Sequence, residues 1–257
     1  MEQKIRIIPK LDIKGPNVVK GIHLEGLRIV GNPKELARKY YKQGADEIFY
    51  VDIVASLYGR NNMVEIVDSA SKEIFIPLSV GGGVRNIDDI NKLLRSGADK
   101  VTINSSAIKN PKLIINAVKR FGSANIVVSI EAKKIGNSKW EAYIENGREK
   151  TGKDVIEWAK KVESLGVGEI IVTSIDKEGT KRGFDIRLIK EICANVKIPV
   201  IACGGAGRIE DIIECAKTGV DGICFASVLH YNLFEISEIK KALLEKGFNV
   251  RYKNEKS

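Results

Sequence analysis

The sequence has few cysteines, no long apolar segment and no basic block interleaved with aromatic residues. Its four cysteines, Cys193, Cys203, Cys215 and Cys224, show no CxxC spacing, so we expect neither a disulfide nor metal ligation by thiolates. Cys203 and Cys224 stand in apolar runs and are interpreted as small core residues. The opening residues MEQKIRIIPK contain no long apolar run, which predicts a cytoplasmic protein without a signal peptide or membrane span.

The charge balance is basic. Hydrophobic residues make up 44% of the chain and charged residues 29%, as in a globular protein, and 42 Lys and Arg against 33 Asp and Glu give a net charge of +9. Because no basic block carries interleaved aromatics, we do not expect a nucleic-acid partner. The excess suits a small phosphorylated substrate, although scattered lysines that only favour solubility would give the same number.

An internal repeat organises the chain. Three segment pairs resemble each other, and the first residues of each pair lie 122 positions apart: GADEIFYVDI (44–53) and GVGEIIVTSI (166–175), IPLSVGGGVRN (76–86) and IPVIACGGAGR (198–208), GADKVTINSSA (97–107) and GVDGICFASVL (219–229). Three pairs at one offset predict two similar halves, about 1–122 and 123–250, within a single domain spanning 1–257.

Short apolar runs alternate with amphipathic helical patterns along both halves. The predicted strands are 5–12, 46–52, 74–80, 99–104, 125–131, 168–174, 197–203 and 221–226. This pattern predicts an α/β fold, a parallel (βα)8 TIM barrel built from two (βα)4 halves, with a doubly wound open sheet as the alternative. Residues 139–152 interrupt the pattern and predict a hairpin that turns at Asn146–Gly147.

The active site of such a barrel lies at the carboxyl ends of its strands. Asp12 and Glu131 end the first and fifth strands, at equivalent places in the two halves, and two carboxylates that face each other are typical of acid–base chemistry. Each could instead pair with a lysine or cap a loop. Asp52 ends the second strand and Asp176 follows the sixth, while Lys20 is expected on a mobile loop, where it covers a phosphate or is simply solvated.

Glycine-rich turns follow the third and seventh strands, at 81–83 and 204–205. Glycine lets backbone N–H groups approach an anion closely. Together with INSS and FASV on the neighbouring strands, these turns predict two phosphate cups that face each other, and hence a long substrate with a phosphate at each end.

Four charged residues stand at the amino ends of strands, on the inward face: Arg6, Glu47, Lys100 and Glu169. Two bases and two acids inside a barrel require partners, so we expect them to pair in a ring. A layer that only stabilises the barrel would need the same residues.

Several motifs resemble the cyclase subunit of imidazole glycerol phosphate synthase over nearly the whole chain: LDIKGPNVVKG, GADEIFYVDI, VGGGVRNIDDINKLLRSGADKVTINSSAIKNP, TGKDVIEWAKKVESLGVGEIIVTSIDKEGTKRGFD and IPVIACGGAGR. The sister isomerase of histidine synthesis shares the half-barrel repeat but lacks these motif combinations. The resemblance implies a lyase or cyclase reaction in which ammonia from a separate glutaminase subunit enters at the barrel bottom. At the top it attacks a bisphosphorylated ribulosyl formimino aminoimidazole carboxamide ribonucleotide, giving imidazole glycerol phosphate and aminoimidazole carboxamide ribonucleotide.

The resemblance implies no metal or organic cofactor, and a heterodimer with the glutaminase docked at the barrel bottom. It makes Asp12 and Glu131 catalytic and the four bottom charges an ammonia gate. The residues implied in substrate or phosphate binding are Lys20, Asp52, Gly83, Asn104, Ser105, Thr173, Asp176, Glu178, Gly179, Gly205, Ala226 and Ser227.

The chain departs from the family pattern at three chemically important positions. Glu131 and Glu178 stand where aspartate is usual, and Lys10 replaces a cysteine. These departures keep open a related role, in which a similar protein passes ammonia to a partner that amidates a nucleotide sugar for surface polysaccharide. A third alternative is another phosphate-binding barrel enzyme.

Overall fold

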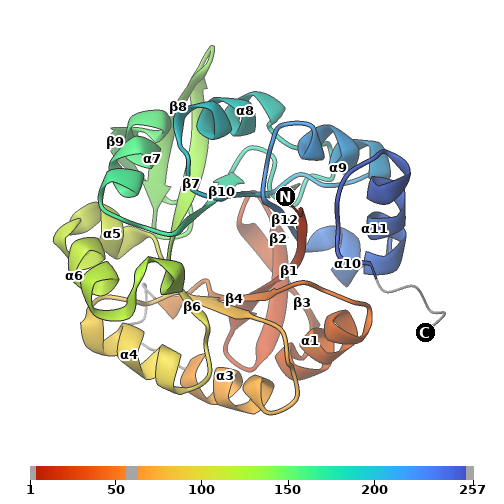
Figure 1. Ribbon diagram of the computed structural model, residues 1–257, viewed down its shortest axis with the longest axis horizontal. Coiled ribbons are helices and arrows are strands. Elements are labelled where there is room, and N and C mark those ends of the chain that lie inside the picture. The colour runs from red at the N-terminus through yellow and green to blue at the C-terminus, as the bar shows by residue number, and fades with distance from the viewer. Residues whose placement is uncertain (1–3, 56–62, 253–257) are drawn as a thin grey trace.

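The computed structural model describes residues 4–55 and 63–252, and its centre is a ring of parallel strands (Figure 1). The strands that form the ring coincide with or lie close to the predicted segments: β1 (Arg6–Lys14), β4 (Ile48–Asp52), β5 (Leu78–Gly81), β6 (Lys100–Ile103), β7 (Ile126–Gly136), β10 (Glu169–Ser174), β11 (Val200–Cys203) and β12 (Gly222–Phe225). Residues along these strands are almost continuously buried, because one face of each strand packs inside the barrel and helices cover the other face.

The ring is closed. Strand β10 pairs with β7 on one side and β11 on the other, and β1 pairs with β12 and β4 in the same manner. The remaining neighbours also run parallel, in the order β12, β1, β4, β5, β6, β7. The predicted (βα)8 barrel is therefore confirmed, and the open-sheet alternative is wrong.

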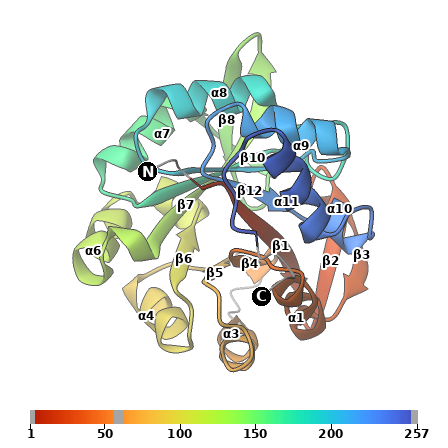
Figure 2. The same cartoon turned by 45° about the vertical axis from the view of Figure 1, so that its right-hand side comes forward.

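Helices surround the barrel on its outer side (Figures 1 and 2). Asn32 and Asn86 start two of them, since their side-chain oxygens accept hydrogen bonds from Lys34 N and Asp89 N at 2.9 Å each. The helices are α1 (Pro33–Lys42), α3 (Met63–Ser71), α4 (Ile87–Arg95), α5 (Ser105–Lys109), α6 (Lys112–Phe121), α7 (Val155–Ser164), α8 (Ile186–Asn195), α9 (Ile209–Ala216), α10 (Ser227–His230), α11 (Ile236–Glu245) and the 3-10 turn Ser123–Asn125.

Two hairpins extend the barrel at its carboxyl end. The predicted one is present as β8 (Lys139–Ile144) and β9 (Glu149–Asp154), joined to the long strand β7. The second, β2 (Asn17–Ile22) and β3 (Glu25–Gly31), was not predicted. Its turn uses the non-glycine residues His23 and Leu24 at positive φ, 52° and 66°, so the Asn-Gly or Asp-Gly signal of a tight hairpin is missing from the sequence.

This second hairpin corrects the expectation for Lys20. Lys20 lies within strand β2, and its side chain is only 2% exposed. The placement on a mobile loop and the solvated alternative are therefore wrong, because the Lys20 ammonium group pairs with buried carboxylates, and the phosphate alternative stays a prediction.

The element positions repeat at the offset found in the sequence. Helices α1 and α7 correspond residue for residue, as do β5 with β11 and β6 with β12, each 122 positions apart. The two hairpins also occupy corresponding places, after β1 and after β7. The structural repeat places the turns after β5 and β6 in the first half opposite those after β11 and β12 in the second.

The barrel lumen has an apolar middle layer. This layer consists of Ile8, Phe49, Val127, Ile171, Ile201, Cys203 and Cys224, all at most 4% exposed. Cys203 and Cys224 pair in register on β11 and β12 as free thiols, which confirms their interpretation as core residues. In the part of the chain that the structure describes, none of the helices has the length and apolarity needed to span a membrane.

Candidate active site

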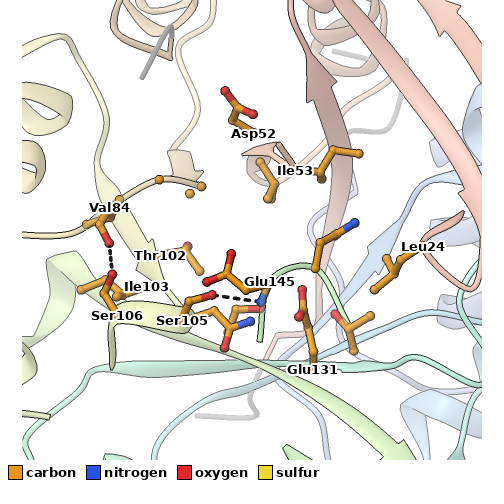
Figure 3. A pocket seen from close by; sticks show the side chains of 18 of the residues that line it. Leu24, Asp52, Ile53, Val84, Thr102, Ile103, Ser105, Ser106, Glu131 and Glu145 are labelled. Carbon is orange, nitrogen blue, oxygen red and sulfur yellow. Dashed lines mark hydrogen bonds between the residues drawn. The ribbon is translucent and has the colours of Figure 1, made fainter. Parts of the chain in front are cut away.

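A cavity of about 250 Å³ lies at the carboxyl ends of the strands and is called the main cavity below. Figure 3 shows Asp52, Ser105, Glu131 and Glu145 around it, contributed by different parts of the barrel. Six of the predicted site residues line it: Asp52, Gly83, Asn104, Ser105, Glu131 and Thr173. The structure thus brings together the first phosphate cup and one of the two predicted catalytic carboxylates.

The second cup forms a separate, much smaller cavity of about 20 Å³. Its lining includes the other predicted set, namely Glu178, Gly179, Gly205, Ala226 and Ser227. A cavity needs roughly 10–15 Å³ by this kind of measure to hold one water molecule. The small cavity therefore has room for about one water, and a phosphate would require its walls to move apart.

Glycine is required at the turns that form both cups. Gly82 has φ of 95° and Gly205 has φ of 114°, a region that other residues rarely adopt. A side-chain carbon at Gly82 would overlap the Asp52 backbone, and one at Gly205 would overlap the carbonyl oxygen of Gly183. The glycines therefore bring neighbouring loops into close backbone contact at each cup.

The sheet register makes Asp12 and Glu131 equivalent. Asp12 on β1 pairs with Val51 on β4, Glu131 on β7 pairs with Thr173 on β10, and Val51 and Thr173 lie 122 positions apart. The equivalence inferred from the sequence thus holds in the strand ladder, although Asp12 and Glu131 themselves are 119 positions apart.

The surroundings of Asp12 are strongly cationic. Its carboxylate lies 2.9 Å from Lys10 Nζ and 3.0 Å from Lys20 Nζ, and Lys20 also contacts Glu178. Burial alone would raise the pKa of Asp12, but the two ammonium groups outweigh it and hold that pKa well below its usual range. Asp12 is therefore held in its ionised form at neutral pH, and this buried side chain does not itself line the main cavity.

Glu131 has the opposite electrostatic character. Burial raises its pKa to about 7, although the N–H of Gly147, which donates to Oε2 at 2.8 Å, and the charge of Lys10 both favour the ionised form. A carboxyl group with a pKa near neutrality can both accept and donate a proton at physiological pH. The two equivalent carboxylates are thus held in different protonation states by their surroundings.

The hairpin turn between β8 and β9 supplies site residues that sequence reasoning missed. Glu145 N donates to Ser105 Oγ at 3.1 Å (Figure 3). The Glu145 carboxylate pairs with Lys109 at 2.8 Å, and both residues line the main cavity. Glu145 has φ of 54° and is followed by Asn146 and Gly147, also at positive φ. The Asn146–Gly147 signal predicted this turn but not that it folds over the cavity.

Two further residues differ from expectation. Asp176 was implied in substrate binding, yet its carboxylate pairs with Lys133 at 2.6 Å and accepts from Lys134 N at 2.8 Å, and it lines neither cavity. Lys10 was noticed only as a departure, yet it lines the main cavity and contacts Asp12. Contacts with the lysines of strand β7 decide the case of Asp176, whereas Lys10 contacts Asp12 from two residues away on the same strand β1.

The predicted charged residues at the amino ends of the strands form a closed arrangement, called the ionic ring. Arg6 contacts both Glu47, at 2.8 Å, and Glu169, and Lys100 contacts the same two carboxylates at 2.9 Å each. The carboxylates are nearly buried, while the side chains of Arg6 and Lys100 are 26% and 18% exposed. The ionic ring therefore closes the lower end of the lumen, below the apolar middle layer.

The fold and site define a (βα)8 barrel protein with a charged cavity at the carboxyl ends of its strands, where barrel enzymes place their active sites. The family model described as "Histidine biosynthesis protein" matches residues 6–235, and the chain belongs to this family.

Two curated relatives carry the name "Imidazole glycerol phosphate synthase subunit HisF". The protein from Legionella pneumophila is 58% identical over 207 residues, which are 80% of this chain and 98% of that protein. The protein from Bacillus cereus is 49% identical over 247 residues, 96% of this chain and 98% of that protein.

Proposed function

We propose that this chain is the cyclase subunit of imidazole glycerol phosphate synthase. It uses ammonia to convert the bisphosphorylated ribulosyl formimino aminoimidazole carboxamide ribonucleotide into imidazole glycerol phosphate and aminoimidazole carboxamide ribonucleotide. The observation that carries the proposal is the equivalent placement of Asp12 and Glu131 on strands β1 and β7, at the end of the barrel that also holds both glycine-lined cups. The similarity to the named synthase subunits supports the particular reaction.

The two carboxylates divide the proton chemistry. Glu131 lines the main cavity with a pKa of about 7, so it takes up the proton released when ammonia adds to the substrate and returns one in a later step. Asp12 stays ionised between two lysines and supplies a fixed negative charge beside the reacting centre. Both residues are therefore needed for turnover.

The phosphates of the substrate occupy the two cups. Backbone N–H groups near Gly83, together with Asn104 and Ser105, hold one phosphate in the main cavity, and Arg85 and Lys109 at its rim add positive charge. Gly205 and Ser227 hold the other after the small cavity opens. Glu178 lines the small cavity, so binding there displaces the carboxylate that now pairs with Lys20.

Ammonia reaches the site through the barrel. A glutaminase subunit docks at the lower face, the ionic ring opens to admit ammonia, and the apolar middle layer favours neutral ammonia over ammonium, because a bare charge is costly to bury there. The docking and the gate are part of this proposal, supported by the closed ring at the amino ends of the strands.

Complementation tests the proposal. A bacterial strain that lacks its own cyclase subunit but retains the glutaminase should grow without histidine when it expresses this chain, and should not grow with the Asp12→Asn variant. Purified protein should also cyclise the substrate with ammonium salt alone. No growth and no cyclisation, while the chain still stimulates a glutaminase, would replace this proposal with the ammonia-conduit role in sugar amidation.

A further inference from the structure

Lys10 is the charged residue of the Asp12 cluster that lines the main cavity. It lies on β1 two residues before Asp12, so both side chains point into the barrel. Lys10 is 6% exposed, and it lines the main cavity together with Glu131, whereas Asp12 and Lys20 do not line it. A substrate in the main cavity therefore meets the Lys10 ammonium before it meets the Asp12 carboxylate.

The Lys10 ammonium has donor capacity to spare. An ammonium carries three N–H donors, and among the residues that the structure describes the single carboxylate within ion-pair distance of Lys10 is Asp12, at 2.9 Å. Lys20, in comparison, contacts two carboxylates, those of Asp12 and Glu178. A buried ammonium with one partner is costly unless another acceptor approaches it, and the open side of Lys10 is the main cavity.

Lys10 also remains charged. Burial lowers the pKa of its ammonium, but the charges of Asp12, Cys203 and Glu178 outweigh burial, and the pKa lies well above its ordinary value. Lys10 is thus a fixed hydrogen-bond donor rather than a base or a nucleophile.

Two buried side chains hold the Lys10 backbone in place. The pairing of β1 with β12 ends at Pro9, and His230 Nε2 donates to the Lys10 carbonyl oxygen at 3.1 Å. His230 Nδ1 then accepts from the Tyr40 hydroxyl at 2.7 Å. Burial lowers the pKa of His230 to about 4, which keeps the ring neutral and this arrangement intact at physiological pH.

We propose that Lys10 is a further catalytic residue, which donates a hydrogen bond to the oxygen of the ketone carbon that ammonia attacks. The inference rests on the proposed function. The ribulosyl unit is a ketose, and an oxygen acceptor in the main cavity completes the donor set of the ammonium. Neither the family comparison nor the acid–base assignment of Glu131 gives Lys10 this role.

In this step ammonia adds to the ketone carbon. The lone pair of ammonia forms the new carbon–nitrogen bond, and the π pair of the carbonyl moves onto its oxygen. The Lys10 ammonium holds that oxygen as its negative charge develops, and one proton of the added ammonia passes to the Glu131 carboxylate. Removing one donor from an oxyanion site typically lowers kcat by about 10²–10³-fold.

The test compares Lys10→Met with the matched control Lys14→Met, an exposed lysine at the end of the same strand. With saturating ammonium salt, Lys10→Met should lower kcat by about 10²–10³-fold across the whole pH range and change KM for the bisphosphate only a few-fold. Lys14→Met should match wild type. If Lys10 acts only as the counter-ion of Asp12, kcat of Lys10→Met on the pH plateau stays near the wild-type value, and only the acidic limb of its kcat–pH profile moves. That result would overturn the inference.

A second variant covers misfolding. If Lys10→Met fails to fold, Lys10→Gln, which keeps a donor but removes the charge, should still lose at least tenfold in kcat, and full activity would refute the role of the charge. The failure of the proposed function is distinct, because wild type itself would then show no ammonia-dependent cyclisation.

Discussion

At the scale of single residues, the site depends on how buried charges are paired. Asp12 and Glu131 were predictable because each follows an apolar run that ends at the same edge of a barrel. Their different electrostatic surroundings were not predictable, because Lys20 reaches Asp12 from strand β2 and the Gly147 N–H reaches Glu131 from the turn between β8 and β9. Asp176 makes the same point in reverse, since lysines of a neighbouring strand withdraw it from the site.

Replacing Asp12 tests the fixed charge. Asp12→Asn keeps the shape but leaves Lys10 and Lys20 facing a neutral amide. We expect ammonia-dependent turnover to fall by roughly 10²–10⁴-fold, measured as steady-state cyclisation, with circular dichroism showing that the fold is retained. Turnover close to wild type would place the essential charge on another group.

Replacing Glu131 tests its protonation through stability. Its folded pKa of about 7 lies above the value of about 4.3 expected in the unfolded chain, so the folded state binds this proton more tightly. The resulting contribution to stability is full below about pH 4 and is lost as pH rises through about 7. Urea unfolding of wild type should show this decline, and Glu131→Gln should lack it, while the exposed control Glu25→Gln should keep it. Identical pH profiles for wild type and Glu131→Gln would contradict the raised pKa.

At the scale of elements, helices and barrel strands could be predicted from apolar periodicity, and the hairpin after β7 from its Asn146–Gly147 turn. The hairpin after β1 was missed because His23 and Leu24 give its turn no glycine or asparagine. That omission also misplaced Lys20, whose position in β2 ties the hairpin to Asp12 and Glu178. Local signals thus determine elements with standard turns, and tertiary contacts determine the others.

The turns after β5 and β11 predict two anion sites. Crystals grown with sulfate should contain one anion beside Gly83 and Ser105 and a second beside Gly205 and Ser227, the second with Glu178 moved away from Lys20. Calorimetric titration with a bisphosphate should show tighter binding than with a monophosphate. An anion at the first turn alone, with equal affinity for both compounds, would remove the two-phosphate interpretation.

The ionic ring joins four strands, and Lys100 tests its role. Lys100→Met removes one cation that contacts both Glu47 and Glu169. Activity with ammonium salt should stay within a few-fold of wild type, whereas activity coupled to glutamine through the glutaminase should change several-fold. The exposed helix residue Lys92, replaced by Met, is the control. An equal loss with both nitrogen sources would contradict the gate.

At the scale of the whole molecule, the 122-residue repeat in the sequence predicted a closed barrel, and the strand ladder closes as expected. The repeat could not predict the asymmetry in cavity volume between the two halves. The main cavity, which contains the first cup, has a volume of about 250 Å³, whereas the small cavity of the second cup has about 20 Å³. Glu178 lines the small cavity, and its carboxylate pairs there with Lys20.

The net charge of +9 predicts salt dependence for an anionic substrate. Long-range attraction speeds encounter and is screened over about 8–10 Å at ionic strengths of about 0.1–0.15 M. Raising KCl should therefore lower kcat/KM for the bisphosphate while kcat changes little. A kcat/KM that is independent of salt would show that the basic excess has no part in substrate capture.

The ionic ring has a further consequence that comes from its connectivity. Each carboxylate touches both cations, so the four side chains form a closed loop in which every pair of neighbours is joined by two independent routes. Breaking one contact leaves all four residues linked in a line, and only a second break divides them. The lower end of the barrel can therefore lose any one of these four contacts without leaving a charge in the lumen unpaired.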